Sequence, residues 1–214
     1  MDEVTIPRWM WPLFVVASAA FLLALAIDQE ALRLAFKSLP VLSLAVGVFL
    51  TLPRTRFRVL MAIGLVFGAG GDFMLELGPF VPGLLLFLVG HLFYIAAFVG
   101  INRSLRPLTG LSWLLVAVVL TLMVADGAGD LVAPVTIYAL VICAMAWRAS
   151  ALHRVAADAV AVPIALGATL FVVSDALIAV NRWAADIPAA SWWIMLTYFA
   201  GQGLIALGAV RNGD

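Results

Sequence analysis

The stretch FRVLMAIGLVFGAGGDFML, residues 57–75, indicates the fold class of this chain. It carries charge only at Arg58, near its start, and at Asp72, near its end. A helix needs about 20 mostly apolar residues to cross a hydrocarbon core about 30 Å thick. Apolar and polar residues do not alternate along the stretch, which argues against a transmembrane strand. We therefore expect residues 57–75 to form a membrane-spanning helix.

The rest of the chain has the same character. Of its 214 residues, 65% are hydrophobic and 11% are charged, whereas a soluble domain carries about 25% charged residues. This composition excludes a soluble globular protein and a disordered chain. The formal net charge of zero gives no attraction to polyanions, so we expect no nucleic-acid partner. The single cysteine, Cys143, excludes a disulfide framework.

Eight segments of this kind predict an all-α polytopic membrane protein, with residues 1–214 forming a single integral membrane domain. Charged residues, Gly and Pro separate the segments, as is typical of loops. We expect the first segment to be retained, because Asp2 and Glu3 do not suit a cleavable signal peptide. The predicted spans are residues 11–27, 34–52, 57–75, 80–100, 108–125, 131–148, 160–180 and 191–209.

The basic residues predict the orientation of these spans, because cytoplasmic loops are enriched in Lys and Arg. With eight spans, nine basic residues lie on the side of the two termini and three on the other side. Both termini are therefore expected to be cytoplasmic. The dominance of Arg over Lys and the abundance of Ala favour a bacterial inner membrane. The nine residues are Arg8, Arg54, Arg56, Arg58, Arg103, Arg106, Arg148, Arg154 and Arg211.

Two carboxylates, Asp72 and Asp175, fall inside predicted spans. A charge at mid-membrane costs about 2.5–3.5 kcal/mol on insertion scales, so such residues usually serve a function. The alternative is a structural polar contact between helices. Each aspartate lies about 22 Å from the cytoplasmic start of its span, at 1.5 Å per residue, so both are expected at one level in the outer half. Gly64 and Gly68 share the helix face of Asp72, which predicts that this carboxylate faces the bundle.

Each aspartate is followed by a helix that carries an aromatic–polar pair. His91 and Tyr94 follow Asp72, whereas Tyr198 and Gln202 follow Asp175. This arrangement favours a four-plus-four parallel repeat with a site at the repeat interface. The alternative for each pair is a hydrogen-bonded group of the protein core.

The remaining chemistry is limited by the residues available. The chain has no nucleotide-binding loop, HExxH or G-x-S-x-G motif. Ser174 adjoins Asp175 and so points about 100° away from it around a helix, which disfavours a Ser-His-Asp triad. Zinc needs three or four ligands, and only His91, Asp72 and Asp175 are candidates, so we expect no metal and no cofactor. Paired carboxylates suit hydrolysis through an oxocarbenium-like state.

Several motifs resemble the YhhN-type lysoplasmalogenase family over nearly the whole chain. Any one of them alone would be weak, but their combination at this spacing is fairly specific. Lys37-Ser38-Leu39-Pro40 resembles the family's Lys-Pro element, although two residues separate Lys from Pro here. The matching motifs are Gly71-Asp72-x-x-Leu75, Phe80-x-x-Gly83-x-x-x-Phe87-x-x-x-His91-x-x-Tyr94, Ser174-Asp175-x-Leu177-Ile178-Ala179 with Asn181-Arg182, and the run Tyr198–Ile205.

The resemblance implies a membrane hydrolase that cleaves the vinyl ether of a lysoplasmalogen. The products would be a fatty aldehyde and glycerophosphoethanolamine or glycerophosphocholine, and the partners a lysophospholipid substrate and membrane lipids. One aspartate would protonate the vinyl carbon while the other stabilises the cation and guides water, in either assignment. His91 and Tyr94 would orient a carboxylate or the water. The expected substrate-binding residues are Lys37 and Arg182, which would hold the headgroup phosphate, together with Ser174, Asn181, Tyr198 and Gln202.

Two other classes stay open from the sequence. A proton-coupled transporter of a small solute could use the paired aspartates as proton carriers. Against this class, Gly70-Gly71 before Asp72 is a candidate helix break, but no matching Gly pair precedes Asp175. A lipid-binding membrane protein without catalytic activity is the third possibility. Only the hydrolase would release an aldehyde.

Overall fold

The computed structural model describes residues 4–212, without the side chain of Arg154. This part of the chain is helical and contains no strand; Thr5 and Leu52 form one isolated β-bridge. The helices are α1 (Met10–Ala26), α2 (Glu30–Phe36), α3 (Leu39–Leu50), α4 (Arg56–Leu77), α5 (Phe80–Ile101), α6 (Pro107–Ala128), α7 (Val132–Ser150), α8 (Asp158–Trp183) and α9 (Ala190–Arg211), with short 3₁₀ turns at Gly129–Leu131 and Ala151–Arg154.

The predicted all-α membrane class is confirmed, but the second predicted span is not one continuous helix. The chain breaks at Lys37 and Ser38, between α2 and α3. Pro40 lies in the first turn of α3; its missing N–H and its ring do not allow α2 to continue through it. Lys37 therefore lies in a helix break and not at the start of a long helix.

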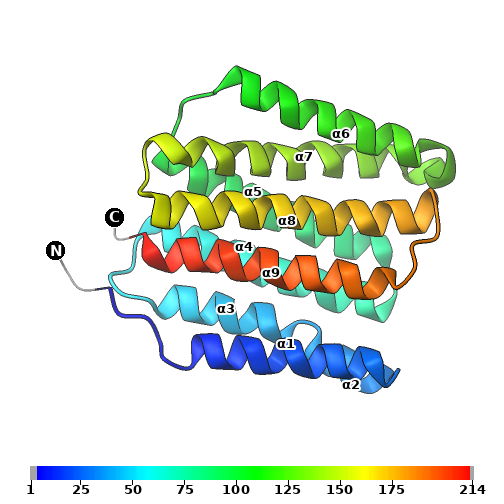
Figure 1. Ribbon diagram of the computed structural model, residues 1–214, viewed down its shortest axis with the longest axis horizontal. Helices are drawn as coiled ribbons and strands as arrows, with labels where there is room; N and C mark the ends of the chain where they lie inside the picture. Colours follow the sequence, from blue (N-terminus) through cyan, green and yellow to red (C-terminus); the bar gives the residue numbers. More distant parts are fainter. Residues whose placement is uncertain (1–3, 213–214) are drawn as a thin grey trace.

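Six stretches of the described residues are long and apolar enough to cross a membrane, and α1 is a shorter apolar helix. One of the six, Pro107–His153, joins α6 and α7 through a 3₁₀ turn. In Figure 1 these two helices lie side by side along the long axis of the molecule. The count of eight spans stays a prediction.

Two helix hairpins form the centre of the bundle, α4 with α5 and α8 with α9. Around them, α3 packs against α4 and α9, while α7 packs against α8 and α5. Glycines allow the close approach within each hairpin. A Cβ added to Gly90 would lie 2.9 Å from the Gly64 carbonyl oxygen, and one added to Gly201 would lie 2.9 Å from the Gly167 carbonyl oxygen. Gly64 and Gly167 each precede an aspartate by eight residues, so the close approach lies at corresponding positions of the two hairpins; the four-plus-four repeat stays a prediction.

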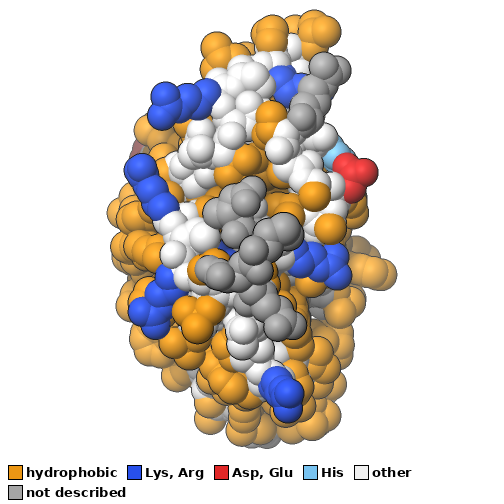
Figure 2. Space-filling model, turned by 90° about the vertical axis from the view of Figure 1, so that its left-hand side faces the viewer, with side chains coloured by type: hydrophobic (Ala, Val, Ile, Leu, Met, Phe, Trp, Pro, Cys, Tyr) orange, Lys and Arg blue, Asp and Glu red, His pale blue; other side chains and the backbone are white. Residues whose placement is uncertain are grey.

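The outer faces of the bundle are apolar, and charge gathers at its ends. Exposed leucines such as Leu108, Leu115 and Leu122 cover α6, as a lipid-facing helix requires. Figure 2 shows the end that carries the two termini, where basic side chains lie around the edge of the surface. The exposed arginines of that end are Arg8, Arg54, Arg56, Arg103 and Arg211.

Arg58 closes this end of the core. Its side chain is buried, and its guanidinium donates to the carbonyl oxygens of Ala209 (3.3 Å), Val210 (3.1 Å), Pro53 and Asn212. The last carbonyl groups of a helix lack partners within the helix, and a cation there also complements the helix dipole. Arg58 thus ties the start of α4 to the end of α9.

Arg58→Met is expected to lower the free energy of unfolding by about 3 kcal/mol, because buried carbonyl groups lose a charged donor. Thermal unfolding of the purified protein in one detergent measures the effect. Arg8→Met, at an exposed position of the same end, is the control and should unfold within a degree or so of wild type. Equal unfolding temperatures for the two variants would contradict this role of Arg58.

Candidate active site

Asp72 lies inside the bundle, as the small-residue stripe predicts, with 3% of its surface exposed. The Tyr198 hydroxyl donates to its Oδ2 at 2.6 Å. Gln202 Nε2 lies 3.4 Å from the Tyr198 oxygen, and the Tyr94 hydroxyl donates to Gln202 Oε1 at 3.0 Å. These four residues, which we call the Asp72 chain, connect α4, α9 and α5 by buried hydrogen bonds.

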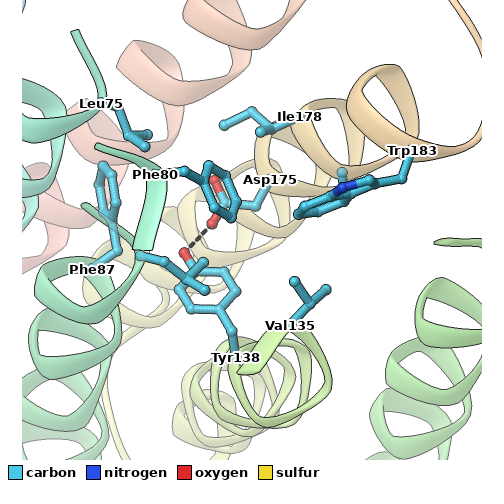
Figure 3. Close-up of a pocket in the computed structure, with 10 residues that line it drawn as sticks. Leu75, Phe80, Phe87, Val135, Tyr138, Asp175, Ile178 and Trp183 are labelled. Carbon is cyan, nitrogen blue, oxygen red and sulfur yellow. Dashed lines mark hydrogen bonds between the residues drawn. The ribbon is translucent and has the colours of Figure 1, made fainter. Parts of the chain in front are cut away.

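Asp175 is the end of a second chain of polar side chains. The Tyr138 hydroxyl donates to Asp175 Oδ2 (Figure 3), and His91 Nε2 lies 3.0 Å from the same hydroxyl. His91 is buried, and its Nδ1 has no hydrogen-bond partner among the residues that the structure describes. The Asp175 chain therefore connects α8, α7 and α5, and the direction of its His91–Tyr138 bond depends on the histidine tautomer.

Aromatic rings fill the space between the two chains. Phe171 lies 4.8 Å from the His91 ring and 5.2 Å from the Tyr198 ring, measured between centroids. Phe87 contacts Phe171 and Tyr198, each at 6.0 Å. The Asp72 chain and the Asp175 chain thus meet across the rings of Phe171 and Phe87.

Asp175, unlike Asp72, lies on the wall of a pocket (Figure 3). Tyr138 is part of the same wall, and the other lining side chains are almost all aliphatic or aromatic. The cavity volume of about 40 Å³ is room for only a few heavy atoms. We call this the apolar pocket; it is lined by Leu75, Phe80, Leu84, Phe87, Val135, Tyr138, Asp175, Ile178, Ala179 and Trp183.

A larger pocket adjoins it at the end of the bundle opposite the termini. The two pockets share Leu75, Phe80 and Ile178 in their walls. The second has a cavity volume of about 370 Å³. Because its charged and polar members are Arg33, Lys37, Glu76, Asn181, Arg182 and Ser191, we call it the charged pocket.

Glu76 organises two of the cations of the charged pocket. Lys37 Nζ lies 2.9 Å from Glu76 Oε2, and Arg33 Nε lies 3.4 Å from Glu76 Oε1. Arg182 makes no ion pair within the described residues; its guanidinium lies 4.5 Å from the centre of the Phe80 ring. Asn181 accepts a hydrogen bond from the Ile187 N–H at 2.9 Å. Arg33 also pairs with Asp28, whose Oδ1 lies 3.3 Å from Arg33 Nη1. Among the described residues, Arg182 is therefore the lining cation that no carboxylate engages, and it suits an anion.

The structure brings most of the sequence-predicted site residues into two groups. Lys37, Asn181 and Arg182 line the charged pocket, and the three tyrosines of the chain all lie in the two hydrogen-bonded chains. Ser174 lies elsewhere: its hydroxyl donates to the Ile194 carbonyl at 3.1 Å and links α8 to α9. Tyr198 and Gln202 contact the Asp72 carboxyl group or each other, and neither lines the two pockets.

Three residues of the site were missed by the sequence analysis. Tyr138 is the only tyrosine of its span, and an isolated mid-span hydroxyl is the signal that could have found it. Glu76 follows Asp72 by four residues and so lies on the same helix face. Arg33 precedes the second predicted span and looked like a loop residue. In the described part of the chain, no three His, Cys, Asp or Glu side chains gather as a metal site would require.

A bundle of apolar helices, two carboxyl groups in its interior and an apolar pocket next to a charged one define a polytopic membrane protein with a site for an amphiphile. The chain belongs to the YhhN family, whose sequence model matches residues 32–209.

Curated relatives of the chain share a name. This chain is 35% identical over 207 residues to the human "Lysoplasmalogenase TMEM86B", and the match covers 96% of this chain and 88% of the relative. It is 36% identical over 162 residues to bovine "Lysoplasmalogenase TMEM86A", covering 71% and 65%. A Mycobacterium bovis "Lysoplasmalogenase" is 31% identical over 196 residues, covering 83% and 70%. No solved structure gives a significant match.

Proposed function

We propose that this chain is a membrane lysoplasmalogenase. It hydrolyses the vinyl ether of a lysoplasmalogen to a fatty aldehyde and glycerophosphoethanolamine or glycerophosphocholine. The observation that carries the proposal is Asp175, a carboxyl group on the wall of an apolar pocket that opens beside a charged one. The names of relatives that cover most of the chain support the same activity.

The two pockets suit the two ends of the substrate. The headgroup phosphate would lie in the charged pocket against Arg182 and Lys37, because guanidinium and ammonium groups bind phosphate well. The first carbons of the chain would pass Phe80 and Ile178, which line both pockets, and reach Asp175. The rest of the chain is too long for the apolar pocket and would stay in the bilayer.

Protonated Asp175 is then the acid of the reaction. It donates its proton to the β-carbon of the vinyl ether. The π electrons of the double bond form the new C–H bond, and the ether oxygen shares the positive charge that develops at the α-carbon of the oxocarbenium ion. Water from the charged pocket adds to the α-carbon and returns a proton to the Asp175 carboxylate. The hemiacetal collapses to the aldehyde and the glycerol hydroxyl. Acid–base catalysis of this kind contributes about 10²–10⁴-fold.

The hydrogen-bonded chains would position and support this carboxyl group. Tyr138 holds Asp175 Oδ2, and His91 holds Tyr138, so the acid has a fixed orientation toward the pocket. Asp72, kept in place by Tyr198, would stabilise the cation through space, because it does not line the pocket.

Aldehyde release from two matched lipids tests the proposal. Purified protein is given a lysoplasmalogen and, separately, its saturated-ether analogue, which protonation cannot activate in this way. Aldehyde from the vinyl ether alone is the expected result. Folded protein that releases no aldehyde would overturn the proposal, and proton flux in liposomes would then be measured for the transporter hypothesis.

Arg182→Gln is expected to raise KM for the lysoplasmalogen by about 10-fold with kcat nearly unchanged. A headgroup contact that is equally strong in the ground state and the transition state affects binding and not the chemical step. Steady-state aldehyde release over a range of substrate concentrations gives both constants. Arg8→Gln, at the opposite end of the bundle, should leave both unchanged, and a fall in kcat alone for Arg182→Gln would contradict a headgroup role.

We further propose that both termini are cytoplasmic and that the charged pocket opens toward the opposite side of a bacterial plasma membrane. The exposed arginines at the terminus end support this orientation. A cysteine introduced at Arg103 or at Asp186 tests it with a membrane-impermeant maleimide on intact cells, since Cys143 is buried. Only the cysteine at position 186 should react; labelling at position 103 alone would reverse the orientation.

A further inference from the structure

A cavity separate from both pockets of the candidate site lies at the terminus end of the bundle. Its volume is about 660 Å³. The lining residues come from the starts of α4 and α8 and from the ends of α5 and α9, so the cavity lies where the two central hairpins meet. We call it the arginine cavity, because Arg56, Arg103 and Arg211 are among its lining residues.

The three arginines have no carboxylate within ion-pair distance among residues 4–212. Asp158, which follows the lining residue Ala157, is exposed to solvent, and its Oδ1 lies 3.8 Å from His153 Nδ1. The helix starts at Arg56 of α4 and Asp158 of α8 add partial positive charge to the cavity wall, since the first N–H groups of a helix carry such charge. The N-cap of α8, Ala157, lines the cavity and has no side-chain acceptor for those groups. Among the described residues, positive charge therefore dominates the wall of this cavity.

The other half of the wall is apolar. Phe57 and Leu60 come from α4 and Ile101 from α5, while Val155 precedes α8 and Val160 lies in its first turn. A cavity for a free inorganic anion would need no such surface. A phospholipid needs both kinds of wall, because its phosphate binds cations while its first methylene groups prefer apolar side chains.

We propose that the arginine cavity binds an anionic phospholipid of the adjacent leaflet. The headgroup phosphate lies among Arg56, Arg103 and Arg211, and the acyl chains lie along Phe57, Leu60 and Ile101. This lipid is not the substrate, because the cavity is at the opposite end of the bundle from the charged pocket and holds neither of the two aspartates. The bound lipid joins the ends of the four central helices and stabilises their arrangement.

Thermal unfolding in defined lipid tests this site independently of any enzymatic activity. Wild-type protein in phosphatidylcholine nanodiscs is compared with protein in nanodiscs that contain phosphatidylglycerol. The anionic lipid is expected to raise the unfolding temperature by about 5 °C. The triple variant Arg56→Gln/Arg103→Gln/Arg211→Gln should lose that difference, and native mass spectrometry should show it with fewer bound phosphatidylglycerol molecules.

The double variant Arg8→Gln/Arg54→Gln is the matched control, because it removes exposed arginines of the same end that do not line the cavity. It should keep the lipid-dependent rise. If the glutamine variant does not fold, the triple lysine variant, which keeps the charge, should fold and retain most of the rise. The same rise in the triple glutamine variant as in wild type would overturn the site. If inorganic phosphate raises the unfolding temperature equally in phosphatidylcholine nanodiscs, the ligand is a free anion and the proposal of a bound lipid is refuted.

Discussion

Asp175→Asn is expected to lower kcat for aldehyde release by about 10³-fold, the loss that removal of a general acid produces. Asparagine keeps the size of the side chain but cannot give a proton to the vinyl carbon. Asp175 is the aspartate that lines the apolar pocket, so no other carboxyl group reaches the same part of the substrate without a rearrangement. Single-turnover aldehyde release with saturating lysoplasmalogen measures the chemical step directly.

Asp126→Asn makes the same chemical change at an exposed position of α6 and should keep full activity. Asp72→Asn should lose less activity than Asp175→Asn, since Asp72 acts on the cation through space and through Tyr198. A larger loss for Asp72→Asn than for Asp175→Asn would favour the alternative in which Asp72 is the acid. Near-normal turnover of both variants would refute carboxylate catalysis at this site.

The helices could be predicted from the sequence because hydrophobic length alone decides where a chain can cross a membrane. For example, the span predicted at residues 80–100 is α5, Phe80–Ile101. The break at Lys37 and Ser38 was missed because hydropathy is insensitive to it. The break depends on Pro40, whose backbone effect is local.

The partners of the two aspartates were harder to predict from the sequence than the aspartates themselves. Asp72 and Asp175 stand out because each is costly in hydrocarbon. Tyr138 does not, since a tyrosine is common among apolar residues and its hydroxyl matters only once α7 has packed beside α5 and α8. Glu76 was assigned to no role because its partners, Lys37 and Arg33, become neighbours only through the fold of α2 against α4. Hydrogen bonds between distant spans leave no local pattern in the sequence.

Tyr138→Phe is expected to lower kcat by about 100-fold with little change in KM, the second largest effect among these predictions. The variant keeps the ring that packs in the apolar pocket but removes the hydroxyl that joins Asp175 to His91. Asp175 then loses the fixed orientation from which it gives its proton to the vinyl carbon. Steady-state kinetics in H₂O and D₂O measure this, and the solvent isotope effect on kcat should rise because proton donation becomes the slower step.

Tyr94→Phe is the matched control, because it removes one equally buried hydroxyl from the far end of the Asp72 chain. Gln202 and Tyr198 remain between that position and Asp72, so the carboxyl group keeps its donor and kcat should fall by less than about 5-fold. A purely structural role for the tyrosines would predict the same loss of stability and activity in both variants. Only a positioning role for Tyr138 predicts that kcat and the isotope effect change in one variant while the unfolding temperatures stay alike. An unchanged isotope effect in Tyr138→Phe would therefore remove Tyr138 and His91 from the reaction and leave Asp175 to act alone.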